Sequence, residues 1–458
     1  MREETGHQGS KTKSGSDKSK AAKITLLTAV MISVADMVGI GVFTSLGFQV
    51  QSITSPFSLL LLWVVGGVVA LCGALSYAEL AAAFPRSGGE YNFLKRTYHS
   101  AVGFMAGWLS ATVGFAAPIA LAAMAFGGYF KGVFPEAPVL ALGLGCVWLI
   151  TIMNICGIKR SSLFQNIATL IKIGLIIAFI VFGFFNGSQE PISFMPTNLD
   201  MHHIIGAPFA ISLVFVMYSY SGWNASTYII GEIEDPKRTL PRTILISTII
   251  VALLYVALNA VFLYTTPMSK MAGQLDVALV VGRHIFGFEG GKIVAGLICF
   301  GLISTISAMV WIGSRVTMVM GEDLALLGVF AKKNRYGAPV LALLMQAIIV
   351  TLLLLTQSFE NILDYIQFSL TLSSFVTVLG VMVLRVTQPH LARPYKTWGY
   401  PFTPIIFLVI TFFMMAYLIL ERPIQSFAGL ATIFAGLLVY YLSNKYSKPP
   451  KPLPGTSS

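Results

Sequence analysis

Charged residues are scarce in this chain. They make up 11% of its 458 residues, whereas 56% are hydrophobic and the mean hydropathy is +0.78. Soluble domains carry about 25% charged residues, so the composition excludes a soluble globular protein. The apolar content, with 12% aromatic residues, equally excludes an intrinsically disordered chain. The composition predicts a polytopic, all-α membrane protein.

Metal ligands and nucleotide-binding motifs are also lacking. The four cysteines lie within or at the ends of apolar stretches, with neither metal-ligand spacing nor a disulfide framework; they are Cys72, Cys146, Cys156 and Cys299. The six histidines are scattered, there is no HExxH motif, and no Walker A sequence is present. We therefore expect no metal, no cofactor, no ATP hydrolysis and no enzymatic activity.

Long apolar runs dominate the remainder of the sequence. A helix needs roughly 20 apolar residues to cross about 30 Å of hydrocarbon. Twelve such spans are predicted, approximately at residues 24–48, 56–83, 99–130, 138–157, 162–186, 204–231, 242–266, 292–321, 338–357, 362–385, 402–420 and 425–443. The polar segments 1–23 and 444–458 are predicted to be tails, and segment 1–23 lacks the apolar core of a signal peptide.

The basic residues predict the orientation. With the N-terminus inside, 24 of the 30 Lys and Arg residues fall in cytoplasmic segments and five fall outside. Positive charge concentrates on the cytoplasmic side of membrane proteins, so both termini are predicted to be cytoplasmic. The formal charge of +11 is spread over every inner loop, facing anionic lipid. This distribution argues against a nucleic-acid partner. We expect a multi-pass protein of the plasma membrane.

Two spans contain interruptions. The first has two glycines in residues 39–43, and the sixth has a polar patch around a glycine in residues 218–224. The glycines could simply let helices pack closely, as we expect for Gly103 and Gly107. Paired interruptions at corresponding positions of two halves, however, are the best sequence indication of a transporter binding site. They predict a five-plus-five inverted repeat, helices 1–5 at about 24–186 and helices 6–10 at about 204–385, followed by two C-terminal helices.

Broken helices provide chemistry suited to a zwitterion. The N-terminal end of a half-helix presents free N–H groups and partial positive charge, and the C-terminal end presents carbonyl groups. We therefore expect a substrate carboxylate at the N–H groups of Ile40, Gly41 and Val42. The substrate ammonium group would lie at the carbonyl groups of the second break, those of Tyr218, Ser219 and Ser221.

Several segments resemble the amino acid–polyamine–organocation superfamily. They occur in the order that family has, over about residues 24–443, and comprise residues 39–43, 77–91, 220–224 with 232–241, and 393–401. The resemblance implies a LeuT-type fold with discontinuous helices 1 and 6 and secondary transport of amino acids. It gives Tyr218 the place of an aromatic lid and Asn224 that of a polar residue near the substrate amine. Alternatively, Tyr218 packs only structurally and Asn224 bridges helices.

The same resemblance bears on partners. Heteromeric relatives carry a cysteine between spans 3 and 4 for an accessory subunit. The corresponding segment 131–138 has none, so no disulfide-linked accessory subunit is expected.

Lys172 lies deep inside the fifth predicted span. Twelve residues from Arg160 at about 1.5 Å each give about 18 Å, close to the membrane centre. An ionisable residue there is functional by default, although a purely structural ion pair is the alternative. By resemblance, Lys172 occupies the sodium position of sodium-coupled relatives, with Ser304 and Thr305 among its neighbours. We therefore expect Na⁺-independent transport.

Asp36 is predicted to lie equally deep in the first span. It precedes the interruption by three residues, and burial disfavours the charged forms of both Asp36 and Lys172. The two side chains are expected to share a central vestibule, where they pair or exchange a proton. The alternative places Asp36 on a water-filled cytoplasmic path.

The sequence thus predicts a secondary active amino acid transporter that works by alternating access, as a proton symporter or an amino acid exchanger. Neutral substrates are favoured because no spare acidic residue is evident for a basic side chain. Two alternatives stay open: a polyamine or organic-cation carrier, which would need several acidic residues at the site, and a nutrient receptor built on a transporter fold.

Overall fold

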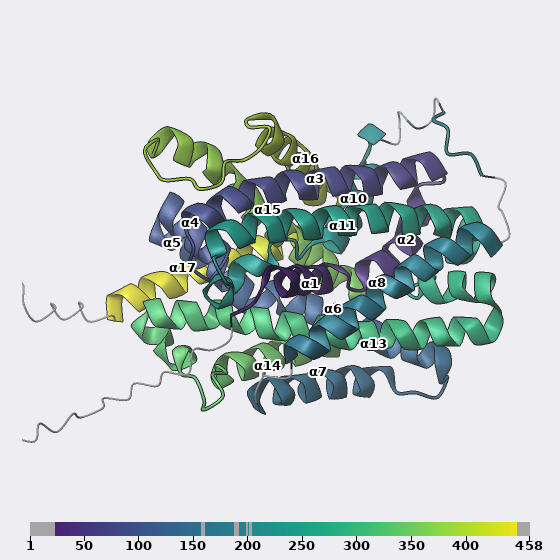
Figure 1. Ribbon diagram of the computed structural model, residues 1–458, viewed down its shortest axis with the longest axis horizontal. Coiled ribbons are helices and arrows are strands. Elements are labelled where there is room, and N and C mark those ends of the chain that lie inside the picture. Colours follow the sequence, from purple (N-terminus) through teal and green to yellow (C-terminus); the bar gives the residue numbers. More distant parts are fainter. Residues whose placement is uncertain are drawn as a thin grey trace, which may run out of the picture.

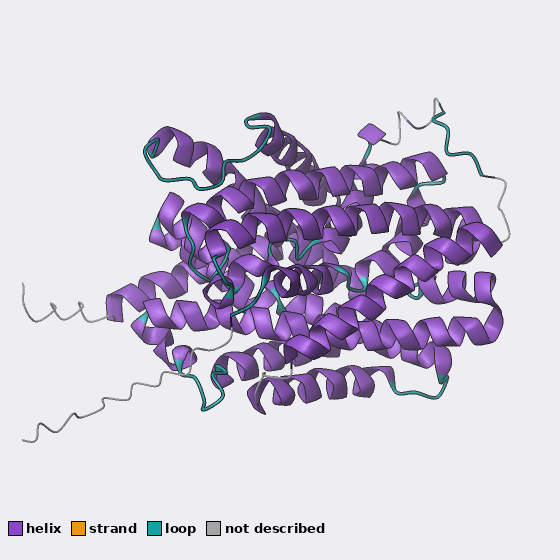
Figure 2. Cartoon of the chain, viewed as in Figure 1, coloured by secondary structure: helices purple, strands orange, loops and turns teal. Residues whose placement is uncertain are grey.

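The computed structural model describes residues 23–156, 161–186, 192–197, 200, 204–356 and 358–446. Regular secondary structure in these ranges is helical, apart from one isolated parallel bridge between Ile24 and Ile233 (Figure 2). In the first half of the chain the helices are α1 (Leu26–Met37), α2 (Gly41–Ser52), α3 (Pro56–Ala83), α4 (Glu90–Thr97), α5 (Ser100–Leu109), α6 (Ala116–Val133), α7 (Val139–Cys156) and α8 (Ser161–Asn186).

The second half continues in the same way. Its helices are α10 (Ala207–Tyr220), α11 (Pro236–Thr265), α12 (Met268–Met271), α13 (Val277–Asp323), α14 (Val340–Thr356), α15 (Phe359–Thr387), α16 (Phe402–Glu421) and α17 (Pro423–Tyr446). Short 3₁₀ segments lie at Ala225–Tyr228, Ile230–Glu232 and Ala325–Ala331, and a π-helical turn lies at Ser110–Gly114.

This is a multi-pass membrane protein. Among the described residues, ten helical segments are long and apolar enough to span a bilayer, and two shorter apolar helices, α10 and α14, accompany them. Each predicted span overlaps one of these helices, but several boundaries were wrong. The largest difference is α13, which was predicted from residue 292 and starts at Val277. It passes through non-helical backbone at Gly287 (φ 74°, ψ −179°), where glycine tolerates the positive φ.

The long helices run side by side along one axis of the molecule (Figure 1). Helix α3 packs along α11, and α6 packs along α13. We call the two ends of the bundle the Ile24 end, where α1 begins, and the Gln49 end, where α2 finishes. At the Gln49 end, the Gly273 N–H donates to the Gly47 carbonyl at 2.8 Å.

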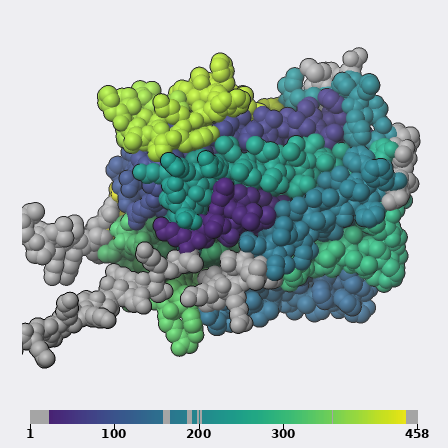
Figure 3. Space-filling view, viewed as in Figure 1, coloured from purple at the N-terminus to yellow at the C-terminus, as the bar shows by residue number. Residues whose placement is uncertain are grey.

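Part of helix α1 reaches the surface of the bundle. On the face shown in Figure 3, its dark purple atoms are visible between α11 and α8, against which it packs, and it also contacts α13. Leu27 is accordingly exposed, whereas the last turn of α1 is buried. Eight of the twelve residues of α1, between Ala29 and Met37, are buried, including those where the helix ends.

A cluster of aromatic residues holds the neighbouring helices together near the end of α1. Trp63 of α3, Tyr220 of α10 and Tyr255 of α11 pack against one another with ring centroids 5.1–6.2 Å apart. The Tyr220 hydroxyl donates to the Trp63 carbonyl at 3.0 Å. All three side chains are fully buried, so the polar tip of Tyr220 needs this partner.

Candidate functional site

The first interruption separates α1 from α2. Helix α1 ends at Met37 and α2 begins at Gly41. Non-helical backbone inside a membrane must find partners within the protein, and the freed carbonyl groups do so. The Met37 carbonyl accepts from the Tyr255 hydroxyl at 2.6 Å, and the Ala35 and Val38 carbonyls each accept from Lys172 Nζ at 3.1 Å.

The start of α2 presents the opposite chemistry. The first N–H groups of a helix have no partner inside it, and within the described residues no acceptor faces the N–H groups of Ile40, Gly41 and Val42. These are the three groups that the sequence predicted as carboxylate donors. The α2 N-terminus therefore offers unpaired donors and partial positive charge.

The second interruption follows α10. This helix continues to Tyr220, two residues beyond the predicted start of the break, and the chain then turns through Gly222 at φ 100°. The Tyr218 carbonyl, an expected ammonium acceptor, instead accepts from the Ser221 N–H at 3.0 Å and the Ser221 hydroxyl at 2.6 Å. Among the described residues no donor reaches the carbonyls of Ser219 and Ser221, so two of the three predicted acceptors are available.

The two interruptions touch at two places. A Cβ added to Gly41 would lie 2.5 Å from the Ser219 hydroxyl and 2.7 Å from Ser219 Cα. A Cβ added to Gly222 would lie 2.5 Å from Asp36 Oδ2. Both separations are shorter than any van der Waals contact, so each glycine is required by the close approach of the other half-helix.

A cavity lies between the interruptions. The space between its lining atoms amounts to about 250 Å³, including the part that is open to solvent. Both breaks contribute to its wall, together with α6 and α13, through residues Asp36, Met37, Gly39, Ile40, Gly41, Pro118, Ala122, Tyr218, Ser219, Ser221, Thr305 and Met309. The sequence-predicted residues Ile40, Gly41, Tyr218, Ser219 and Ser221 are thus brought to one site.

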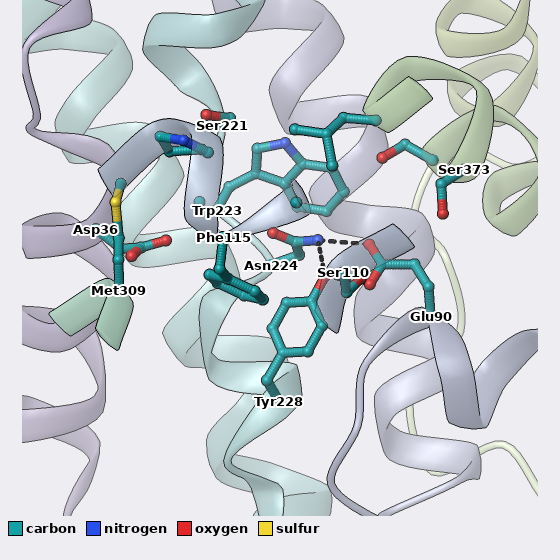
Figure 4. Close-up of a pocket in the computed structure, with 15 residues that line it drawn as sticks. Asp36, Glu90, Ser110, Phe115, Ser221, Trp223, Asn224, Tyr228, Met309 and Ser373 are labelled. Carbon is teal, nitrogen blue, oxygen red and sulfur yellow. Dashed lines mark hydrogen bonds between the residues drawn. The ribbon is translucent and has the colours of Figure 1, made fainter. Parts of the chain in front are cut away.

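A second cavity of about 660 Å³ adjoins the first, and the two share Asp36, Pro118, Ser221 and Met309 in their walls. Figure 4 shows Asp36 on one side of this cavity and Glu90 on the other, with Trp223 and Asn224 between them. Ser110 and Gly114 of the π-helical turn also line it. Such turns inside α-helices frequently mark functional sites.

Glu90 is surrounded by donors. Its carboxylate accepts from the Tyr77 hydroxyl at 2.8 Å, from Asn224 Nδ2 at 2.7 Å and from the Tyr228 hydroxyl. We refer to these four residues as the Glu90 cluster. The side chain of Asn224, which the resemblance placed near the substrate amine, therefore lines the larger cavity while bridging to α4. The sequence had indicated Glu90 only as part of the segment 77–91.

Lys172 lies behind α1. Its ammonium group donates to Thr305 Oγ1 at 2.6 Å as well as to the Ala35 and Val38 carbonyls, which gives it three acceptors on α1 and α13. A cation is favourable at the C-terminal end of a helix. Thr305 thus has the neighbour that the resemblance implied, and Ser304 is buried beside it. Lys172 lines a separate small cavity, not the two that Asp36 lines.

Charged pairs join the elements at the Ile24 end. The Asp323 carboxylate accepts from Arg86 at 2.6 and 3.1 Å, from Lys95 at 2.8 Å and from the Tyr91 hydroxyl at 2.7 Å. Arg315 pairs with Glu232 at 2.8 Å. These pairs link α4, the segment before it and the segment after the second break to α13. Sequence reasoning missed Asp323, because its partners lie more than 200 positions away.

A polar cavity between two interrupted membrane helices is the arrangement of a secondary transporter. The family model described as "Amino acid permease" matches residues 24–442, and the chain belongs to this family.

Similar proteins include the Asc-type amino acid transporter 1 of Mus musculus, with 28% identity over 94% of this chain and 82% of the relative. The human Large neutral amino acids transporter small subunit 2 is also 28% identical, over the same shares. The b(0,+)-type amino acid transporter 1 of Mus musculus is 27% identical over 92% of this chain and 87% of its own length.

Proposed function

We propose that this protein carries amino acids across the plasma membrane by alternating access, as a secondary active transporter. One observation carries the proposal: Ile40 and Gly41, whose N–H groups have no partner among the described residues, line the same small cavity as Ser219 and Ser221, whose carbonyl groups accept from no donor there. Such donors suit the carboxylate of an amino acid, and such acceptors suit its ammonium group. The relatives named as amino acid transporters support the same function.

Neutral amino acids are the proposed substrates. Among the described residues, Asp36 and Glu90 are the acidic side chains on the walls of the two central cavities, and no Lys or Arg lines them. Glu90 is occupied by three donors, so it leaves no free carboxylate for a basic side chain. A neutral side chain needs no charged partner on these walls.

Transport is proposed to be independent of Na⁺ and coupled to protons or to exchange. Lys172 Nζ occupies a position surrounded by three oxygen atoms, those of Ala35, Val38 and Thr305, and oxygen ligands are what a hard cation requires. The ammonium group therefore takes the place of a bound metal cation. Asp36, Lys172, Ser304 and Thr305 are the proposed coupling residues.

The membrane topology belongs to the same proposal. Twelve spans, a five-plus-five repeat, cytoplasmic tails at 1–23 and 444–458 and a transporter domain over 24–443 account for the ten long and two shorter apolar helices. We further propose that the protein works without a disulfide-linked accessory subunit, since residues 131–138 contain no cysteine.

Uptake into proteoliposomes tests this function. The purified full-length chain is supplied with a panel of labelled amino acids, with and without Na⁺, a pH gradient and internal unlabelled substrate. We expect saturable uptake of neutral amino acids that persists when choline replaces Na⁺. Binding without uptake under every condition would instead favour a receptor, and uptake of polyamines alone would favour the cation carrier.

A further inference from the structure

Asp36 is a buried carboxylate that lines both central cavities. Its side chain is 4% exposed, and within the described part of the chain Oδ1 has no hydrogen-bond partner. Figure 4 shows it directed into the larger cavity from the α1 side. Gly222 leaves space for it, since a Cβ there would lie 3.2 Å from Asp36 Cγ. The carboxylate therefore faces space that a ligand can enter.

The neighbouring groups do not pair with it. Lys172 on α8 is the nearby cation, but its three N–H groups are directed to the Ala35 and Val38 carbonyls and to Thr305, and an ammonium group has three donors. Tyr218 faces Asp36 from α10, and Glu90 and Tyr228 lie across the larger cavity. Glu90 and Tyr228 are bonded to each other. Lys172, Glu90 and Tyr228 thus make their hydrogen bonds with groups other than Asp36.

An unpaired carboxylate is costly in this environment. A buried charge requires a partner or else becomes neutral. The substrate of the proposed function carries an ammonium group, and that group enters the cavity whose wall includes Asp36. Once the substrate has left, a proton from the water in the open cavity is the simplest remaining way to neutralise the carboxylate.

We propose that Asp36 binds the ammonium group of the substrate, and that a proton and the substrate occupy its carboxylate alternately. This inference rests on the proposed function and deepens it. Binding transfers the Asp36 proton to water on the side where the cavity is open, and substrate release takes a proton up from water on the other side. The substrate and the proton therefore cross the membrane in opposite directions, which is substrate–proton antiport and not symport.

Proton release on binding tests the proposal. The full-length protein in detergent and weak buffer is titrated with L-alanine, L-serine, L-leucine or L-phenylalanine, while an indicator dye reports pH. The neutral amino acid that binds best is then compared with its α-hydroxy acid, which keeps the carboxylate and lacks the ammonium group. We expect close to one proton released per amino acid bound and none released by the hydroxy acid.

Asp36→Asn should abolish the proton release. We also expect it to weaken amino acid binding by about 30-fold or more, the usual effect of removing one partner of a buried charge pair, and to leave hydroxy acid binding nearly unchanged. Asp364→Asn is the matched control, because Asp364 is equally buried at 4% exposure and lines neither central cavity. Asp364→Asn should release protons and bind the amino acid as the wild type does.

The outcomes distinguish a failure of this inference from a failure of the proposed function. Amino acid binding to the wild type without proton release overturns the inference, whether or not the Asn variant folds. An unchanged preference for the amino acid over the hydroxy acid in Asp36→Asn overturns it as well. Failure of every amino acid to bind or move in the wild type contradicts the proposed function itself.

Discussion

Replacing Gly41 with alanine should separate the two interruptions. The added Cβ would lie 2.5 Å from the hydroxyl, 2.7 Å from Cα and 2.9 Å from Cβ of Ser219. Rotating the serine side chain moves the hydroxyl but not Cα, so backbone must shift. Overpacking of this kind costs about 1–3 kcal/mol. If the shift displaces the Ile40 and Gly41 N–H groups from the substrate carboxylate, the same energy lowers affinity by about 5–150-fold.

The assay is equilibrium binding of a labelled amino acid to the purified variant, accompanied by a thermal unfolding measurement. Gly296→Ala is the matched control, because it makes the same substitution inside α13, where a new Cβ meets nothing within 4 Å. It should bind like the wild type and unfold at an equal or higher temperature, since alanine favours helix by about 1 kcal/mol over glycine. If Gly41→Ala binds as tightly as Gly296→Ala, the contact between the half-helices does not set the site geometry.

Three further predictions follow from the described contacts. Replacing Na⁺ with choline should leave wild-type uptake unchanged, and Na⁺-dependent uptake would contradict the proposed role of Lys172. Lys172→Ala should lower uptake at least about 10-fold, because the Ala35 and Val38 carbonyls and Thr305 lose their donor. Arg86→Ala should open the Ile24 end, because the pair of Arg86 with Asp323 closes it. In a background without the exposed Cys156, a hydrophilic thiol reagent should then label Ser110→Cys about 5-fold faster. An unchanged labelling rate would refute that role of the pair. At the Gln49 end, burial raises the pKa of Asp200, but hydrogen bonds from Ser55, Ser58 and Thr197 outweigh it and hold the pKa below its usual range. The carboxylate therefore stabilises the fold fully above about pH 4. The stability difference between wild type and Asp200→Asn should shrink as pH falls from about 4 towards the lowered pKa of the folded state, as thermal unfolding across pH would measure.

The positions of the two interruptions could be predicted from local sequence alone. Glycine and serine inside an apolar run stand out against their surroundings, and the structure ends α1 at Met37 and α10 at Tyr220, within a few residues of the predicted sites. The place of Lys172 inside a long apolar helix likewise followed from the sequence alone. The interruptions and the place of Lys172 are properties of single segments, and such properties can be predicted from periodicity and composition.

The contacts between segments could not be predicted in that way. The Glu90 cluster joins α3, α4 and the second break, and no local pattern states which of several buried polar residues will meet. The same holds for Asp36 and Lys172, which line neighbouring but different cavities. Whether they pair or exchange a proton stays a prediction, because it depends on how α1 packs against α8 and not on either segment alone.

An experimental structure with a bound neutral amino acid tests the central claim most directly. The account predicts a carboxylate oxygen within about 3.2 Å of a backbone nitrogen of Ile40, Gly41 or Val42, and the ammonium group on the side of Asp36 and the Ser219 and Ser221 carbonyls. An amino acid bound elsewhere, or first and sixth membrane helices that run uninterrupted past these residues, would contradict it.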